Sequence, residues 1–171
     1  MNRYNILKVI SFFIYLIAQA LIFNKIILFG TTYSFVYIGF LLTLPIELAV
    51  IPGMLIGLAM GLGMDAFTNT FGLHAAASVL LMYIRSFLIS SLTPQGGYQL
   101  GVTPRPNIIG LGWFTSYALP LIFIHHSVVF FVEFGGFAMF FSTLLKVVLS
   151  TGYSFLLIVV IQYIFITKIR K

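Results

Sequence analysis

The chain has 171 residues, of which 61% are hydrophobic and only 7% are charged, and its formal net charge is +6. Soluble globular proteins carry about 25% charged residues, so this composition excludes a water-soluble domain and indicates an integral membrane protein. There are no cysteines, which excludes disulfides, zinc sites with thiolate ligands and cysteine-ligated clusters.

Apolar runs divide the whole chain into candidate membrane spans. A spanning helix needs about 20 mostly apolar residues, and six runs approach that length: 6–23, 28–46, 48–66, 73–92, 109–131 and 138–165. The sequence therefore predicts an all-α polytopic membrane protein with about six transmembrane helices in a single domain, 1–171. Pro45 and Pro52 either kink a helix or end one, so the helix boundaries next to them stay open.

The first run has some features of a cleaved signal peptide. Basic residues precede it, and Ala18-Gln19-Ala20 resembles a cleavage site. The apolar stretch nevertheless continues to Phe23, and further membrane runs follow. We interpret the first run as a retained helix.

Basic residues predict the orientation of these helices. An even number of helices places both chain ends on one side, and that side would hold seven of the nine basic residues: Arg3, Lys8, Arg85, Arg105, Lys168, Arg170 and Lys171. Lys25 falls on the opposite side. Lys and Arg are enriched in cytoplasmic loops, so both termini are predicted to be cytoplasmic, and the positive charge needs no nucleic-acid partner.

Glycines recur every fourth residue in the third run, at Gly53, Gly57 and Gly61, followed by Asp65 at the same spacing. In lipid, small residues allow two helix backbones to approach closely. We assign Gly53, Gly57, Gly61 and Gly72 to a helix-packing or partner interface, although glycine is also frequent in ordinary membrane helices. The spacing does not tell whether the seam packs within the chain or against a partner.

The third run ends at Asp65, and His74 opens the fourth. A short loop between them predicts that both residues lie at similar depth. Asp65 would then accept a hydrogen bond from His74 or cap the fourth helix near Gly72, where the N-terminal end of the helix favours negative charge. Structural pairing fits this arrangement better than catalysis.

Further polar residues are predicted to share the non-cytoplasmic half. With Asp65 and His74, the set comprises His125, His126, Glu133 and Lys146. We predict a polar cavity or rim that a partner or ligand contacts. Adjacent helical residues point about 100° apart, so His125 and His126 do not suit one ion, and no metal or cofactor is expected. Simple snorkelling is the alternative for Lys146.

Arg85 is expected near the cytoplasmic end of the fourth helix. By topology the nearest opposite charge is Glu47, in the short connection before the third helix. We predict either an Arg85–Glu47 pair or snorkelling of Arg85 to the lipid headgroups.

The one long loop, 93–107, contains two Thr-Pro pairs and Gly96-Gly97, and the only tryptophan, Trp113, follows it. Proline and glycine argue against a helix in this loop, and Trp113 suits an aromatic belt at the membrane interface. No phosphate-binding loop, nucleophile elbow or acid–base pair is found. The sequence thus predicts no catalytic residues and no enzyme activity.

One stretch resembles a known family. Gly57 to Asp65, followed by Phe71-Gly72-Leu73-His74-Ala75 and Tyr83, resembles the core signature of the rod shape-determining protein MreD family, and Leu44-Pro45 before Glu47 is similar too. The specific part covers about 40 residues of the chain. The remainder agrees in length, hydropathy and basic ends, and the long Pro/Gly loop departs from the family pattern.

The resemblance implies a non-enzymatic scaffold of the bacterial cell-elongation machinery, in the inner membrane. Family members bind the membrane-anchored protein MreC and help couple MreB filaments to peptidoglycan synthesis by RodA and its partner transpeptidase. The family is also similar to substrate-binding subunits of energy-coupling factor vitamin transporters. A transporter subunit is therefore the alternative function. The Ala-x-x-x-Ala contact common in such subunits is missing from the first run, where only Ala18 and Ala20 occur.

Overall fold

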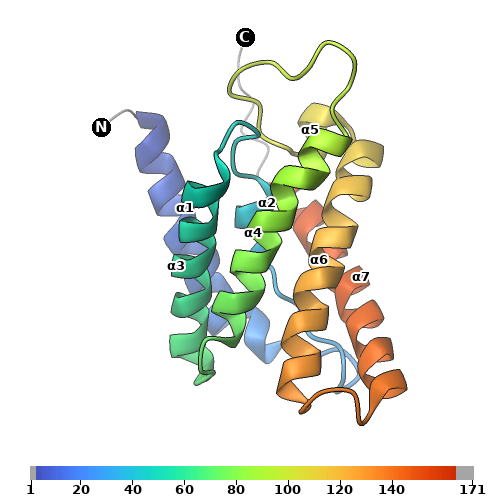
Figure 1. The fold of residues 1–171 in the computed structure, drawn as a ribbon. Coiled ribbons are helices and arrows are strands. Elements are labelled where there is room, and N and C mark those ends of the chain that lie inside the picture. Colours follow the sequence, from blue (N-terminus) through green and yellow to red (C-terminus); the bar gives the residue numbers. More distant parts are fainter. Residues whose placement is uncertain (1–2, 165–171) are drawn as a thin grey trace.

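The structure is a computed structural model that describes residues 3–164, with side chains described from residue 6 onward. Long helices form a bundle (Figure 1): α1 (Arg3–Leu21), α3 (Val50–Thr68), α4 (Leu73–Ser91), α6 (Leu111–Glu133) and α7 (Phe140–Ile164). Three short helices complete the described part: η1 (Phe23–Lys25), α2 (Ile38–Leu42) and α5 (Pro106–Ile109). No β-strand is assigned within 3–164, where an isolated bridge pairs Leu28 with Thr32.

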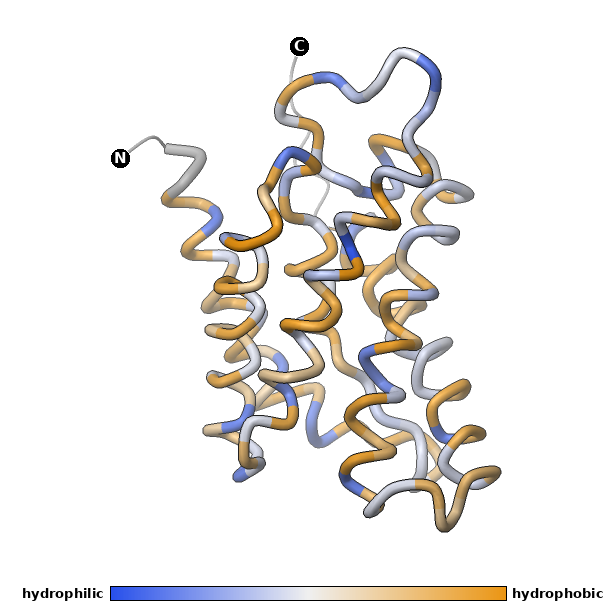
Figure 2. Tube along the Cα trace, in the orientation of Figure 1, coloured by the Kyte–Doolittle hydropathy of each residue, from blue (hydrophilic) through white to orange (hydrophobic). Residues whose placement is uncertain are grey.

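The five long helices are each long and apolar enough to cross a membrane. Hydrophobic residues extend along most of each helix, whereas hydrophilic ones gather towards the two ends of the bundle and in the loop at the top (Figure 2). We call the end where α1 begins and α7 ends the upper end, and the end where α3 turns into α4 the lower end (Figure 1). The chain is thus a helical, polytopic membrane protein.

The second predicted span is the main difference from the sequence-based expectation. Of the predicted helix 28–46, only Ile38–Leu42 is helical. Phe29 and Gly30 have positive φ angles of 51° and 71°, which turn the chain away from a helix at its start. Pro45 follows the other end, where it cannot donate a backbone hydrogen bond. The described part of the chain therefore contains five spanning helices and one largely non-helical crossing.

Pro52 has a different role. It occupies the third position of α3, which begins at Val50. The first turn of a helix has no intrahelical partner for its N–H groups, so a proline is tolerated there. Pro45 accordingly ends one element, whereas Pro52 lies inside the start of the next.

The non-helical crossing, which we call the central segment (residues 28–46), passes through the middle of the bundle (Figure 1). Every residue from Ser34 to Leu44 is buried. Around it, α3 packs on α4, α4 on α6 and α6 on α7, while α1 packs against α3. Irregular backbone at membrane depth is tolerated only where protein or water surrounds it. Enclosure by the five helices meets that condition.

Candidate functional site

The glycine seam lies between α3 and α4, inside the chain. A Cβ added at Gly61 would meet the Cα of Ala75, its N at 2.5 Å and the carbonyl oxygen of His74 at 2.6 Å. One added at Gly57 would lie 2.9 Å from the carbonyl oxygen of Ser78. The seam is therefore a helix-packing surface filled by α4, which excludes it as the docking face for another protein.

Gly72 differs from the three seam glycines. It is the N-cap of α4 with φ +80°, and an added Cβ would meet no atom within 4 Å. Its role is conformational, because left-handed backbone favours glycine. The predicted part of Gly72 in helix packing within the chain is therefore wrong.

Asp65 caps α4 from the end of α3. One carboxylate oxygen accepts from the backbone N–H of His74 (3.0 Å) and from the Thr70 hydroxyl, and the other accepts from the N–H of Ala75 (3.0 Å). The first N–H groups of a helix have no internal partner, and negative charge is stabilising there. Asp65 thus joins the two helices at the lower end of the seam, through the His74 backbone and not its ring.

Replacing Asp65 by alanine is expected to destabilise the α3–α4 pair. Both capping bonds would be lost, and cap removal costs about 0.5–2 kcal/mol, with the upper part of that range expected because Asp65 is 5% exposed. Thermal unfolding in detergent, followed by circular dichroism, measures the effect. The control is Glu133→Ala, which removes an exposed carboxylate; equal losses for both variants would contradict the capping role.

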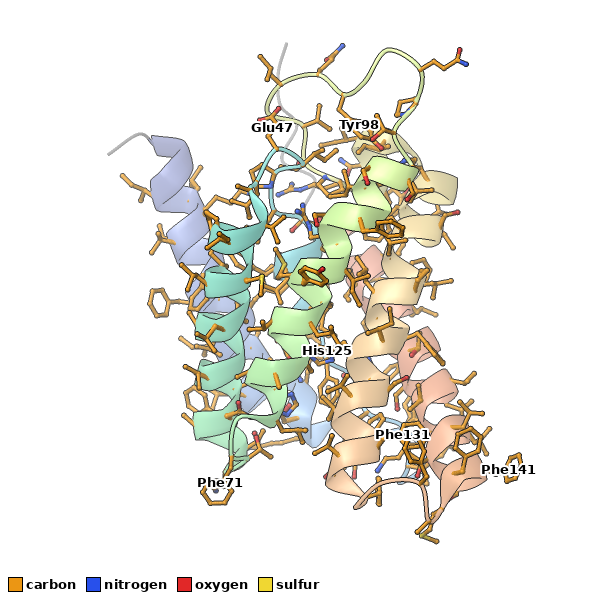
Figure 3. The ribbon with its side chains drawn as sticks, viewed as in Figure 1. Glu47, Phe71, Tyr98, His125, Phe131 and Phe141 are labelled. Carbon is orange, nitrogen blue, oxygen red and sulfur yellow. The ribbon has the colours of Figure 1, made fainter. Side chains whose placement is uncertain are left out.

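Two histidine rings and one tyrosine hydroxyl meet at the central segment. The Tyr37 hydroxyl lies 2.7 Å from Nε2 of His125 and 3.2 Å from Nδ1 of His74. Phe35 packs against both rings and against His126, with centroids 4.9 Å apart for the last pair. We call Tyr37, His74 and His125 the buried triad; His125 is among the labelled residues inside the bundle in Figure 3.

The buried triad leaves unused hydrogen-bonding capacity. A hydroxyl donates one hydrogen bond, so Tyr37 donates to one histidine and accepts from the N–H of the other. Nδ1 of His125 and Oγ of Ser78, both buried, have no hydrogen-bond partner among the described residues. Unsatisfied buried polar groups are rare in proteins. These two atoms are the polar positions near the triad at which a small ligand or water would gain a partner.

Of the remaining members of the predicted polar cluster, His126 lies beside the buried triad, with its ring centroid 5.8 Å from that of His125. His126 binds Oγ of Ser154 (3.0 Å) and the carbonyl of Ile122 (2.8 Å). Lys146 lies over the rings of Tyr33, Phe130 and Phe134, at 4.2–4.8 Å from their centroids, as a cation–π contact requires. Glu133 is exposed at the end of α6. The six residues therefore do not form one site, and within 3–164 no group of three His, Cys, Asp or Glu residues is placed to hold a metal ion.

Several of the other buried side chains bind the backbone of the central segment through their polar atoms. Oε1 of Gln19 accepts from the N–H groups of Val36 (2.6 Å) and Tyr37 (3.3 Å), while its Nε2 donates to the carbonyl of Ser34 (2.8 Å). The Tyr117 hydroxyl donates to the carbonyl of Leu42 (3.0 Å). These side chains replace the hydrogen bonds that a helix would make internally.

Serines of α7 complete this arrangement. Ser150 accepts from the N–H of Tyr33 and Ser154 from that of Phe35, both at 3.0 Å. Two residues along an extended chain advance about 6.6 Å, and four residues along a helix advance about 6 Å. The near match lets one face of α7 bind alternate residues of the central segment.

Arg85 binds carbonyl groups in place of the expected carboxylate. Its Nη2 donates to Leu44 (2.6 Å) and Pro45 (3.1 Å), and its Nε donates to the Tyr117 hydroxyl (2.8 Å). Glu47 instead accepts from the N–H of Gly101 (2.6 Å) in the long loop. Arg85 is 2% exposed, so it does not snorkel, and it stabilises the carbonyls left at the end of α2.

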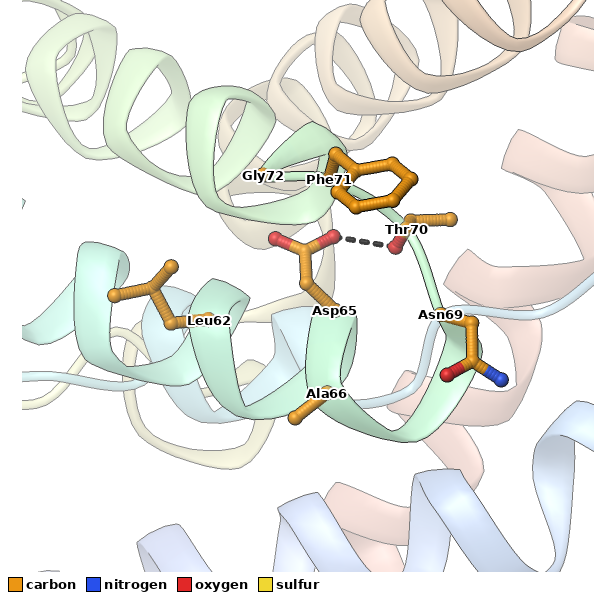
Figure 4. Close-up of a pocket in the computed structure, with 7 residues that line it drawn as sticks. All are labelled: Leu62, Asp65, Ala66, Asn69, Thr70, Phe71 and Gly72. Atoms are coloured by element: carbon orange, nitrogen blue, oxygen red, sulfur yellow. Dashed lines mark hydrogen bonds between the residues drawn. The ribbon is translucent and has the colours of Figure 1, made fainter.

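A pocket opens at the lower end, beside the turn between α3 and α4 (Figure 4). Its lining includes Asp65 and Asn69 on α3's side and Thr70, Phe71 and Gly72 in the turn, and the Thr70–Asp65 hydrogen bond crosses it. Phe71 is fully exposed and points away from the bundle (Figure 3). This turn is the most exposed part of the stretch from Gly57 to Ala75.

Comparison with protein-family models, with curated proteins and with solved structures gives no match to this chain. The functional argument therefore rests on the residues themselves.

Proposed function

We propose that this protein is a non-enzymatic scaffold of the bacterial cell-elongation machinery, similar to the MreD family, in the inner membrane. The observation that carries the proposal is the stretch from Gly57 to His74. Its glycines and Asp65 are the residues that hold α3 and α4 together and cap the turn between them. These residues make α3 and α4 a rigid helical hairpin, and the turn between the two helices is exposed at the lower end of the bundle.

The partner contact is proposed at this tip, because α4 fills the glycine seam. Phe71 and the adjoining pocket lie at the lower end, away from the end that holds Arg85 and Arg105. By the positive-inside rule the lower end is non-cytoplasmic, where the soluble part of MreC would be found. Exposed aromatic side chains are enriched at protein interfaces. Contacts with RodA, its transpeptidase and MreB would then be made through the same assembly.

A complementation experiment tests this proposal. Depletion of the protein should turn rod-shaped cells round, and the wild-type chain should restore the rods and co-purify with MreC. Phe71→Ala should reduce MreC recovery severalfold without changing thermal stability, because its ring makes no buried contact. Phe87→Ala is the matched control, since Phe87 is an exposed phenylalanine near the other end of α4. Rods that persist after depletion would reject the function, and equal MreC recovery from both variants would reject the contact.

One observation supports the alternative function as a transporter subunit. Transporter binding sites are built from interrupted spans near mid-membrane, and the central segment is such a span, with the unpartnered Ser78 Oγ and His125 Nδ1 beside it. If the protein purified from native membranes retains a vitamin at stoichiometric amounts together with an ATPase pair, this alternative replaces the scaffold.

A further inference from the structure

The buried triad is a continuous hydrogen-bonded chain that joins three parts of the fold. Nδ1 of His74, on α4, lies 3.2 Å from the Tyr37 hydroxyl, which lies 2.7 Å from Nε2 of His125, on α6. Tyr37 belongs to the central segment, where it is the N-cap residue of α2. Both distances are those of hydrogen bonds. The hydroxyl therefore connects the two rings, and with them two spanning helices.

The outer nitrogen at each end of this chain has no partner. His74 is the second residue of α4, at the lower end, and is 4% exposed; its Nε2 makes no hydrogen bond with the described residues and is not fully buried. Nδ1 of His125 is fully buried and also has no partner among them. One end of the chain is thus accessible from the lower end of the bundle, and the other lies in the interior.

The described neighbours of the buried triad do not fix the direction of its hydrogen bonds. Asp65, the acidic residue of α3, binds the backbone N–H of His74 and not its ring. The ring nitrogens of His126, on α6, bind a serine and a carbonyl outside the triad. Lys146, on α7, lies over other rings, and α1 contributes the uncharged Gln19. The triad therefore keeps a choice of where its protons lie.

A hydroxyl donates one hydrogen bond and accepts others, which allows two arrangements of the neutral triad. In the first, Nδ1–H of His74 donates to Tyr37, and the Tyr37 hydroxyl donates to Nε2 of His125. In the second, the hydroxyl donates to Nδ1 of His74, and Nε2–H of His125 donates to the Tyr37 oxygen. Both rings therefore carry their proton on the nitrogen of the same name, Nδ1 in the first arrangement and Nε2 in the second.

We propose that the buried triad is a proton relay between the lower end and the interior of the bundle. A hydronium ion at the lower end gives a proton to Nε2 of His74. The Nδ1 proton of that ring passes to the Tyr37 oxygen, while the hydroxyl proton passes to Nε2 of His125. Nδ1 of His125 then releases its proton to a water molecule in the interior. One proton enters and one leaves, and the triad changes from the first arrangement to the second. Chains of ionisable side chains inside membrane spans are typical of proton relays. This function is independent of the scaffold function.

His126 provides an internal comparison, because its neighbours fix its tautomer. The carbonyl of Ile122 can only accept, so Nδ1–H of His126 donates to it (2.8 Å). Nε2 of the neutral ring then accepts from the Ser154 hydroxyl (3.0 Å). His126 is as fully buried as His125. A difference between these two rings therefore reflects their hydrogen bonds and not their burial.

The first test is solid-state nitrogen NMR of the full-length protein in lipid bilayers, with isotopically labelled histidine, at neutral pH. Protonated and unprotonated ring nitrogens have separate chemical shifts, so the spectrum reports the tautomer of each ring. We expect His74 and His125 to show both tautomers in equal proportions to one another, and His126 to show the Nδ1–H form. A single tautomer for His74 or His125, or different proportions in these two rings, overturns the proposal.

The second test measures how fast the ring N–H of His125 exchanges with water. A positioned proton donor and acceptor accelerates transfer about 10²–10⁴-fold, so Tyr37→Phe should slow this exchange by about 100-fold or more. Tyr33→Phe is the matched control, because it removes a hydroxyl of the central segment that makes no described hydrogen bond; its exchange should equal that of the wild type. Unchanged exchange in Tyr37→Phe, or equal slowing in both variants, overturns the relay. Circular dichroism checks the fold, and if Tyr37→Phe does not fold, the tautomers of the wild type decide.

Discussion

Gly61→Ala is expected to cause the largest loss of stability of any single methyl addition in the seam. The new Cβ would overlap backbone atoms of Ala75 and His74, so no side-chain rotation relieves the contact and α3 must move away from α4. Overpacking a well-packed interior costs about 1–3 kcal/mol, and we expect about 3 kcal/mol or more here, because the shift also pulls Asp65 away from the N–H groups that it caps.

The measurement is thermal unfolding in detergent, with Gly57→Ala and Gly152→Ala beside it. Gly57 should show an intermediate loss, because its added Cβ would meet the Ser78 carbonyl oxygen at 2.9 Å. Gly152 lies in α7 with open space around it, so alanine there should be neutral or stabilising by up to about 1 kcal/mol. If the three variants unfold at the same temperature, the seam does not hold the two helices together.

Gln19→Leu is expected to release the central segment from α1. The substitution keeps the size of the side chain but removes the acceptor for two N–H groups and the donor to the Ser34 carbonyl. Each buried polar group left without a partner costs about 1–3 kcal/mol, so we expect a total loss of about 3–5 kcal/mol. α1 is the least buried of the long helices, which makes this anchor a large part of its attachment.

Gln162→Leu is the control for this substitution. Gln162 is also buried, on α7, but its described hydrogen bond is a single one, to the Tyr15 hydroxyl (3.1 Å). Losing one neutral hydrogen bond costs about 1 kcal/mol. The ratio of the two losses, read from thermal unfolding of the purified variants, is the informative quantity. Comparable losses would show that the central segment does not depend on Gln19.

The long helices could be predicted from the sequence, because the hydropathy that indicates them is a sum over individual side chains. Apolar runs and helix-ending residues placed α3, α4, α6 and α7 within a few residues of their bounds. The central segment could not be found in this way. Hydropathy records that 28–46 is apolar, but it does not record which groups will bind its backbone.

A usable signal for the central segment was present in the last span. Its buried polar residues recur at helical spacing: Thr143, Ser150, Thr151, Ser154 and Gln162. A membrane helix whose polar stripe faces inward has to satisfy those groups inside the bundle. That stripe predicts a polar partner at the centre, although it does not say that the partner is backbone.

The candidate site was predicted in part, for reasons that differ from residue to residue. The position of Asp65 beside the start of the fourth helix followed from the short loop. The buried triad did not, because Tyr37 was expected on a regular helix and the three members come from separate stretches of the chain. Arg85 was matched with the nearest carboxylate, whereas the carbonyls at the end of α2 are closer acceptors.

The central segment also sets an order of events during biosynthesis. Its residues leave the ribosome early, yet the serines that receive the Tyr33 and Phe35 amides follow 117 and 119 residues later. Until that last helix has entered the bilayer, those amides lack their final acceptors. A chain truncated before Phe140 would keep its other hydrophobic helices but would leave the Tyr33 and Phe35 amides without their serine acceptors. We therefore expect membrane proteases to degrade such an incompletely packed chain until translation of the last helix is finished.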